Sequence, residues 1–252
     1  MQTLVFTNQK GGVAKTSSSY ALACGLHIRG KRILLVDLDP QSNLSYTVGL
    51  DDTNEWTLYD CFKGNCSVED CKQTIKEGLD ILSIGLQATA ADIELSSRTA
   101  REYILKKELS NQDYDYCIID TSPSLGLLTL NALTAANLVI IPTAAEIYSL
   151  QGLSQLGGFI ENVKEFTNKD LKISGLLLTR YNERLNLTQA LQENIEQAAK
   201  ILNTVVYDTK IRESVAVKET QLLRGNIFDE APKAKATLDY TAFIDEFLSK
   251  EE

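Results

Sequence analysis

The sequence lacks several features that would place it among membrane, secreted or metal-rich proteins. No apolar run approaches the roughly 18 residues of a membrane-spanning helix, and the first residues form no charged and apolar leader. The five cysteines are an odd number in a chain without a secretory signal, which argues against a disulfide framework. The single histidine, His27, has no partner at ligand spacing and is interpreted as a structural or surface residue. These absences predict a cytoplasmic protein with no membrane partner.

The chain also lacks the positive excess that is typical of nucleic-acid-binding proteins, because its net charge is −9. The charge is unevenly distributed. Between residues 180 and 235, nine Lys and Arg accompany eight Asp and Glu, so this stretch carries +1 and the remainder carries −10. A solvated mixed surface is the commoner outcome of such a stretch, and a locally basic face is the alternative.

The 252 residues are enough for one sizeable core, and no internal repeat, low-complexity run or linker divides them. Apolar runs alternate with helical patterns, which predicts an α/β fold: a mainly parallel twisted sheet with helices on both faces, in a single domain over residues 1–252. The predicted strands are residues 4–7, 32–36, 79–84, 116–120, 138–142 and 173–179. The predicted helices include residues 16–29, 91–109 and 233–249.

A glycine-bearing stretch, K-G-G-V-A-K-T at residues 10–16, follows the first predicted strand and precedes the first predicted helix. Backbone N–H groups in such a loop point at an anion, and the helix dipole adds partial positive charge. The strict phosphate-loop pattern fails at Gln9 and Ala14, but the deviant pattern K-G-G-x-x-K-[ST] fits. We expect Lys15 to contact the β- and γ-phosphates of a bound nucleotide and Thr16 to ligate Mg²⁺. The predicted nucleotide-binding residues are Lys10, Gly11, Gly12, Val13, Ala14, Lys15, Thr16 and Ser17.

Three carboxylates follow apolar strands. Asp37 and Asp39 come at the end of the run 32–36, and their spacing of two residues points both the same way on an extended segment. Asp120 ends the run 116–120, which has the form of a Walker B strand. Because the carboxyl ends of parallel strands share one edge of a sheet, we expect these carboxylates beside the phosphate loop, with Asp120 serving the water shell of Mg²⁺.

These motifs together resemble the deviant Walker A ATPases, the family of ParA/Soj partition proteins, MinD and the nitrogenase iron protein. Residues 37–43, D-L-D-P-Q-S-N, are similar to the switch I segment of this family, with Ser42 in place of its usual glycine, and residues 121–126 are similar to switch II. Residues 146–156 and 180–187 resemble the corresponding segments of ParA/Soj proteins in particular. The resemblance covers nearly the whole chain.

The resemblance implies roles for individual residues. Lys10 would reach across a dimer to the partner's ATP, so it joins Lys15 and Asp39 as a catalytic residue. Asp39 would position or activate the attacking water. Asp37 would support Mg²⁺ without binding it directly, so the implied metal-site residues are Thr16, Asp37 and Asp120. The segment 211–215 matches the family's I-P-R-N-V, which lies near the adenine, only loosely.

The same resemblance implies an ATP hydrolase that forms an ATP-dependent homodimer and binds DNA non-specifically, as a nucleoid-associated partition protein. A ParB-type centromere-binding protein would stimulate hydrolysis, which dissolves the dimer. Operator-specific binding is not expected, because no DNA-reading extension precedes the phosphate loop. The candidate DNA-binding residues are Arg180, Arg184, Lys210, Arg212, Lys218 and Arg224.

The residues argue against two other functions of this family. A MinD-like membrane positioner usually ends in a basic amphipathic helix, whereas residues 236–252 contain five acids and one lysine. An electron donor like the nitrogenase iron protein needs cysteines that bridge subunits, and Cys24 and Cys117 are not placed for that. Two alternatives stay open: a positioner of a protein cargo, and a nucleotide-gated adaptor with negligible ATP hydrolysis.

Three further cysteines, Cys61, Cys66 and Cys71, follow one another at intervals of five residues. Zinc sites usually pair cysteines two to four residues apart, and iron–sulfur motifs use tighter runs. We interpret these cysteines as small apolar residues of the core.

Overall fold

The computed structural model describes residues 1–50, 54–144, 149–182 and 188–251. Within these residues eight strands form one twisted sheet in the order β3-β4-β2-β5-β1-β6-β7-β8. All neighbouring strands are parallel except β3 and β4, which are antiparallel. The strands are β1 (Gln2–Phe6), β2 (Ile33–Leu38), β3 (Gln73–Lys76), β4 (Leu79–Ser83), β5 (Tyr116–Thr121), β6 (Leu138–Ala144), β7 (Lys172–Tyr181) and β8 (Val206–Arg212).

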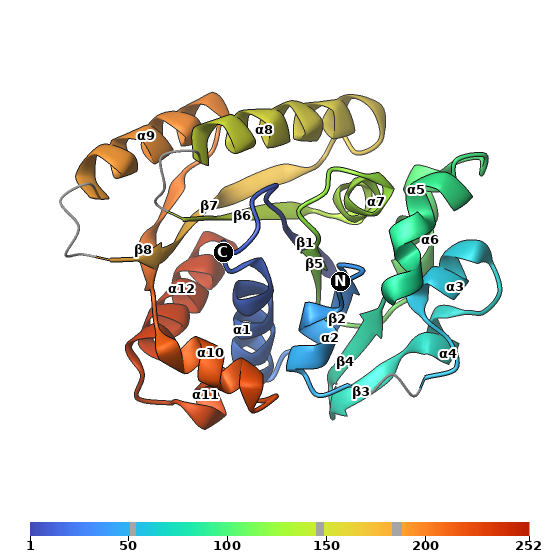
Figure 1. Ribbon diagram of the computed structural model, residues 1–252, viewed down its shortest axis with the longest axis horizontal. Helices are drawn as coiled ribbons and strands as arrows, with labels where there is room; N and C mark the ends of the chain where they lie inside the picture. The colour runs from blue at the N-terminus through green and yellow to red at the C-terminus, as the bar shows by residue number, and fades with distance from the viewer. Residues whose placement is uncertain (51–53, 145–148, 183–187, 252) are drawn as a thin grey trace.

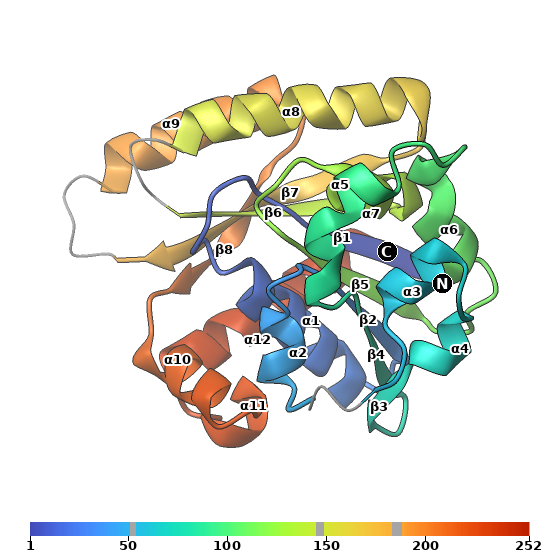
Figure 2. The same cartoon turned by 45° about the vertical axis from the view of Figure 1, so that its right-hand side comes forward.

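Helices cover both faces of the sheet, as Figures 1 and 2 show. One face carries α1 (Lys15–Ile28), α2 (Asn43–Thr47), α10 (Val215–Leu222), α11 (Ile227–Glu230) and α12 (Lys235–Glu251). The other face carries α3 (Leu58–Lys63), α4 (Val68–Cys71), α5 (Ala91–Glu94), α6 (Ile104–Leu109), α7 (Leu127–Ala135), α8 (Ser149–Phe166) and α9 (Thr188–Ile201), with the short 3₁₀ turns η1 (Leu86–Ala90) and η2 (Arg101–Tyr103). Among the described helices, none combines the length and the apolar character that crossing a membrane requires.

The alternation of side chains along the strands decides which residues face α1. In β2, Leu35 belongs to the apolar cluster on the α1 side and Val36 to the cluster on the opposite side. The same alternation places Asp37 on the α1 side, and in β5 it places Ile118 and Asp120 there. Asp37 and Asp120 are partners in the register of the β2–β5 pair. The fold therefore brings two carboxylates side by side under the first helix.

The predicted α/β sheet, mainly parallel and covered on both faces, is confirmed, but the described residues form eight strands where the sequence predicts six. The two additional strands are β3 and β8, the outermost strands of the sheet. The residues of β3 alternate between partly buried and exposed positions, and β8 buries Tyr207 and Ile211 but places Asp208, Thr209 and Lys210 between them. Edge strands bury little apolar surface. They therefore lack the continuous apolar sequences that predict the six inner strands.

The prediction of one helix over residues 91–109 is wrong. The chain forms α5, a turn, η2 and then α6 in this segment. The turn contains the serines and threonine of residues 96–99, which compete for backbone hydrogen bonds, and Ser96 Oγ donates to the Ile93 carbonyl at 2.7 Å. Ala100 then adopts a left-handed backbone conformation with φ 54°, which a continuous helix cannot contain.

Candidate nucleotide site

The start of the loop between β1 and α1 is held by two hydrogen bonds of the Asn8 side chain. Asn8 Nδ2 donates to the Pro142 carbonyl at 2.7 Å, and Asn8 Oδ1 accepts from the Lys10 amide at 3.0 Å. Gly12 and Ala14 have left-handed backbones, with φ 73° and 59°. Helix α1 begins at Lys15 without a side-chain cap and without an acidic residue in its first turn. Its first amides and its dipole therefore favour an anion at this end.

Lys15 extends from the start of α1 back toward the loop. Its Nζ donates to the Lys10 carbonyl at 3.1 Å, and the residue is only 7% exposed. Burial lowers the pKa of Lys15, while the charges of Asp120 and Asp39 act in the opposite direction. A buried ammonium group beside carboxylates, at the N-terminus of a helix, is well placed to meet phosphate oxygens.

Thr16 and Asp120 connect the loop to the sheet. Thr16 Oγ1 donates to Asp120 Oδ2 at 2.6 Å, and Asp120 is fully buried. The other oxygen, Oδ1, has no hydrogen-bond partner among the described residues. Burial raises the pKa of Asp120 well above its ordinary value, and the charge of Asp37 raises it further. A hydroxyl, an unsatisfied carboxylate oxygen and unbalanced negative charge fit a small, hard divalent cation such as Mg²⁺.

Asp37 is also fully buried, but its oxygens already have partners. Asp37 Oδ2 accepts from the Ser45 amide at 2.8 Å and from Ser45 Oγ at 2.7 Å, and Oδ1 accepts from the Asp39 amide at 3.2 Å. Burial raises the pKa of Asp37 to about 6, although these hydrogen bonds partly offset it. Asp37 therefore fastens both the turn after β2 and the helix α2 that follows it.

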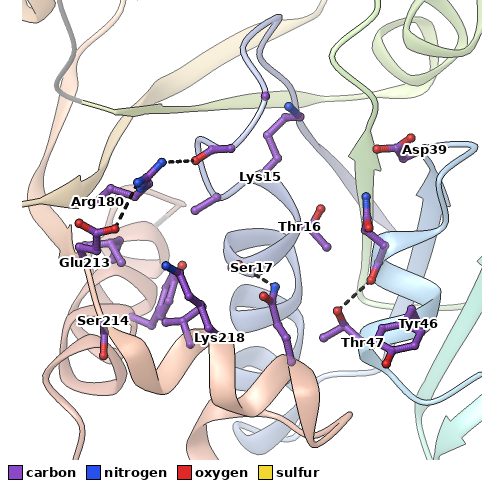
Figure 3. A pocket seen from close by; sticks show the side chains of 18 of the residues that line it. Lys15, Thr16, Ser17, Asp39, Tyr46, Thr47, Arg180, Glu213, Ser214 and Lys218 are labelled. Atoms are coloured by element: carbon purple, nitrogen blue, oxygen red, sulfur yellow. Dashed lines mark hydrogen bonds and ion pairs between the residues drawn. The ribbon is translucent and has the colours of Figure 1, made fainter.

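Asp39 lies at the wall of a cavity of about 760 Å³ that opens over the loop (Figure 3). Its Oδ1 accepts from the Gln41 amide at 3.0 Å, which holds the carboxylate at the turn after β2. Asp39 also lines a second cavity, of about 290 Å³, with Pro123 and Gly126 of the segment that follows β5. The large cavity is lined by Gly11, Gly12, Ala14, Lys15, Thr16, Ser17, Asp39, Gln41, Asn43, Tyr46, Thr47, Pro123, Arg180, Ile211, Arg212, Glu213, Ser214, Val217, Lys218, Gln221, Leu222 and Tyr240.

Comparison with known proteins agrees with this arrangement. A family model described as "AAA domain" matches residues 1–173. The chain is 43% identical over 220 residues to the sporulation initiation inhibitor protein Soj of Bacillus subtilis strain 168, and the match covers 86% of each chain. The chain belongs to the ParA/Soj-type family of P-loop ATPases. It is accordingly an ATP hydrolase.

Two further proteins extend the similarity of this ParA/Soj-type ATPase to its whole length. It is 34% identical over 257 residues to the chromosome partitioning protein ParA of Caulobacter vibrioides strain NA1000 / CB15N, covering 100% of this chain and 95% of the relative. Among solved structures it is similar to the cobyrinic acid a,c-diamide synthase of Mycobacterium smegmatis with bound ATP analog and magnesium. That similarity has a TM-score of 0.88 and 32% identity, and covers 100% of this chain and 96% of the other.

The structure places most of the predicted nucleotide-binding residues of the ParA/Soj-type ATPase on the cavity wall. Val13 is buried, and its carbonyl accepts from Thr179 Oγ1 at 3.1 Å, so it positions the loop from behind. Lys10 is partly exposed and is not among the residues that line the cavity of its own chain. The loosely matching segment 211–215 supplies four lining residues, Ile211 to Ser214.

Sequence reasoning missed part of this wall. Arg180, at the end of β7, donates from Nη1 to the Gly12 carbonyl at 3.2 Å and from Nη2 to Glu213 Oε1 at 3.2 Å. Figure 3 shows Arg180 between the loop and Glu213. Gln221 of α10 donates to Ser17 Oγ at 3.1 Å. A usable signal existed for Arg180, because ligands in open α/β sheets bind outside the carboxyl ends of the strands.

The six candidate DNA-binding residues do not form one group. Arg180, Arg212 and Lys218 line the large cavity, and Arg212 also makes a two-point ion pair with Asp239. The Lys210 ammonium lies 4.8 Å from the centre of the Tyr181 ring, and the Arg224 guanidinium lies 4.6 Å from the centre of the Tyr46 ring. Arg184 lies outside the described residues. Their role in DNA binding stays a prediction.

Proposed function

We propose that this ParA/Soj-type ATPase partitions DNA: it dimerises around ATP, binds DNA non-specifically in that state, and is reset when a partner stimulates hydrolysis. The observation that carries the proposal is the Thr16–Asp120 hydrogen bond beneath the phosphate loop, with Asp39 beside the same cavity. The names of the relatives from Bacillus subtilis and Caulobacter vibrioides support a partition system as its setting.

The proposed substrate is ATP, with Mg²⁺ as its metal. The amides of residues 11–16 and the Lys15 ammonium would bind the phosphates, and Thr16 and Asp120 would hold the metal. Bound Mg²⁺ would supply neutralisation of charge on the phosphate oxygens. Asp39 would orient the attacking water, because its carboxylate is fixed at the cavity wall by the Gln41 amide. Asp37 would keep Asp39 in place, because its Oδ1 accepts a hydrogen bond from the Asp39 amide.

Lys10 is proposed to complete the ATP site of a second copy. Its partial exposure and its position outside the lining of its own cavity support this role. The dimer would therefore form only when both sites hold ATP. Each Lys10 side chain would contact the γ-phosphate of the ATP bound to the other subunit. Hydrolysis would remove these γ-phosphates, and the dimer would then separate.

A basic hollow next to the nucleotide cavity supports DNA as the ligand of the dimer. This hollow, of about 840 Å³, is lined by Arg212, Lys218, Lys233 and Lys235, with Glu213 as its acidic member. Lys233 and Lys235 are exposed. A local cluster of cations lets an acidic chain bind phosphates without sequence specificity. In a cell the protein would then be cytoplasmic and associated with the nucleoid, with a ParB-type centromere-binding protein as the stimulating partner.

The test is binding to a duplex of arbitrary sequence at low salt, with ADP, with ATP, and with ATP and the Asp39→Ala variant, whose hydrolysis is slowed. Binding confined to the ATP states and steeply weakened by salt is the expected result. Absence of DNA binding in every state, with ATP-dependent dimers observed by light scattering, would overturn DNA as the cargo and favour a positioner of a protein cargo.

A second candidate follows from the name of the solved structure, cobyrinic acid a,c-diamide synthase, at 32% identity. An amide-forming enzyme would couple ATP turnover to an acid acceptor and a nitrogen donor. Phosphate release that proceeds without either compound, and that DNA or a partner protein accelerates, is expected for the partition ATPase. Turnover that requires the acceptor would favour the synthase.

A further inference from the structure

Three cysteines that do not line the nucleotide cavity lie together in α3, in α4 and on the turn between these helices. Cys61 Sγ is 3.2 Å from Cys66 Sγ and 3.3 Å from Cys71 Sγ. Cys61 and Cys71 are buried, whereas Cys66 is partly exposed on the turn between the two helices. Cys61 is thus the one sulfur that contacts both others.

The spacing of these sulfurs is closer than ordinary packing. Carbon atoms in contact lie about 3.5–4.0 Å apart, and sulfur is larger than carbon. Formation of a disulfide from either contact needs an approach of about 1.2 Å, because the bond length is about 2.05 Å. The turn that carries Cys66 contains Gly64, with φ 86°, and the exposed Asn65. No group of three or more His, Cys, Asp or Glu in the described part of the chain is arranged to hold a metal ion.

We propose that Cys61 is the shared sulfur of a thiol–disulfide site, with Cys66 as its surface partner and Cys71 as its buried partner. The oxidant is a small-molecule disulfide such as oxidised glutathione. This inference does not depend on the proposed partition function.

The reaction proceeds by thiol–disulfide exchange. The Cys66 thiolate attacks one glutathione sulfur, and the glutathione thiolate that leaves takes up the proton lost by Cys66. The Cys61 thiolate then attacks the Cys66 sulfur, and the second glutathione leaves with the proton of Cys61. The Cys71 thiolate can attack the Cys61 sulfur of the new bond, which returns Cys66 as a thiol with the proton of Cys71. Two protein thiols are oxidised and one glutathione disulfide is reduced to two thiols.

The surroundings make the exchange slow at neutral pH. Burial raises the pKa of the Cys66 thiol to about 12, and its contact with Cys61 adds to this. The contact with Cys71 and burial also raise the pKa of Cys61. The charged groups that act on the two sulfurs are acidic: Asp60 and Asp70 on Cys66, and Glu108 of α6 on Cys61. While the pH is below these pKa values, the thiolate fraction and the rate of exchange should rise about tenfold for each unit by which the pH is raised.

The experiment treats the reduced full-length chain with oxidised glutathione in mildly alkaline buffer, blocks remaining thiols, and maps disulfides by mass spectrometry. The expected result is the loss of two of the five thiols, with Cys61 in every intramolecular disulfide. Cys24 and Cys117, both buried and outside the cluster, are internal controls that stay reduced. Unchanged thiols, or glutathione attached to Cys66 without an intramolecular bond, would overturn the proposal.

Serine variants test the shared role of Cys61. In Cys66→Ser the only disulfide should be Cys61–Cys71, and it should form more slowly, because the exposed thiol is lost. In Cys71→Ser the only disulfide should be Cys61–Cys66. In Cys61→Ser no intramolecular disulfide should form, and a Cys66–Cys71 bond there would contradict the assignment. Thermal melting of each reduced variant checks that it folds, and the mapping of the unmodified chain decides the question if one does not.

Discussion

Thr16 of the phosphate loop and Asp120 of β5 are joined by a hydrogen bond of 2.6 Å from Oγ1 to Oδ2. The remaining oxygen of Asp120 has no partner among the described residues, and the neighbouring strand places Asp37 at the same level. Two buried carboxylates side by side repel each other, and the Lys15 ammonium offsets this only in part, because the pKa of Asp120 is still raised. A bound divalent cation would therefore reduce the electrostatic repulsion between Asp37 and Asp120.

The variant Asp120→Asn should be more stable than the wild-type protein but less active. Removing the buried charge should raise the free energy of unfolding of the ligand-free protein by about 1 to 3 kcal/mol. The same change should lower kcat for ATP at least about 100-fold, because the carboxylate that is proposed to hold the metal is lost. Urea denaturation and phosphate release measure the two effects.

The matched control is Asp113→Asn, an exposed carboxylate paired with Arg32. Its stability should change by less than about 0.5 kcal/mol, and its activity should not change. An Asp120→Asn protein that is less stable and still hydrolyses ATP at the normal rate would refute this account of the carboxylate.

The raised pKa of Asp37 predicts how stability depends on pH. Its pKa is about 6 in the folded protein against 3.8 in the unfolded chain, so the folded state binds more protons between these values. The stability contributed by this group is therefore highest below about pH 4 and falls by about 3 kcal/mol as pH rises to about 6. Carboxylates with lowered pKa, such as Asp60 and Glu246, act in the opposite direction. The measurement is thus a difference: unfolding of wild type and Asp37→Asn, without nucleotide, across this range. The wild-type protein should lose stability relative to the variant as pH rises, and parallel curves would show that Asp37 does not titrate there.

The central sheet and the phosphate loop could be predicted because their residues carry local signals. Strands that are buried on both faces, such as β2 and β5, have continuous apolar sequences. The carboxylates at the ends of these strands lie at one edge of the sheet. Left-handed conformations at Gly12 and Ala14 also agree with the motif, although alanine adopts this conformation with strain that glycine would not have.

The rest of the site depends on tertiary placement that no local pattern encodes. Arg180 reaches the loop because β7 ends beside it, and Glu213 meets Arg180 because the chain turns after the edge strand β8. The sequence showed an arginine in a mixed-charge stretch, which is equally compatible with a DNA-binding face. The contact between Cys61 and Cys71, ten residues apart, likewise follows from the packing of two short helices.

The Arg180–Glu213 pair should affect nucleotide affinity more than stability. Its side chains are 45% and 47% exposed, and pairs of that kind contribute about 0–1 kcal/mol to folding. Arg180→Met removes a cation from the phosphate end of the cavity and should weaken ATP binding about threefold to tenfold. Glu213→Gln removes the competing anion, so ATP should bind as tightly as in wild type or up to about threefold more tightly. Titration with a fluorescent ATP analogue measures both. Equal weakening in the two variants would show that the pair only shapes the cavity wall.

The basic hollow should account for DNA binding in the ATP state. Replacing both Lys233 and Lys235 with glutamate reverses two exposed cations of the hollow, and glutamate is tolerated at the start of α12 because it favours the helix dipole. The affinity for a non-specific duplex should fall at least about tenfold at low salt, and the slope of log affinity against log salt should decrease by about 2. ATP hydrolysis without DNA should not change.

The matched control replaces Lys31 and Lys169 with glutamate. Both are exposed, and neither lines the hollow, so the double variant has the same change in net charge at other places on the surface. If DNA binds through the hollow, the control keeps most of the affinity and the wild-type salt slope, because only contacts with phosphates release counterions. Equal losses in the two double variants would mean that overall charge, and not this surface, sets the affinity, and the DNA-binding face would then have to be sought elsewhere on the molecule.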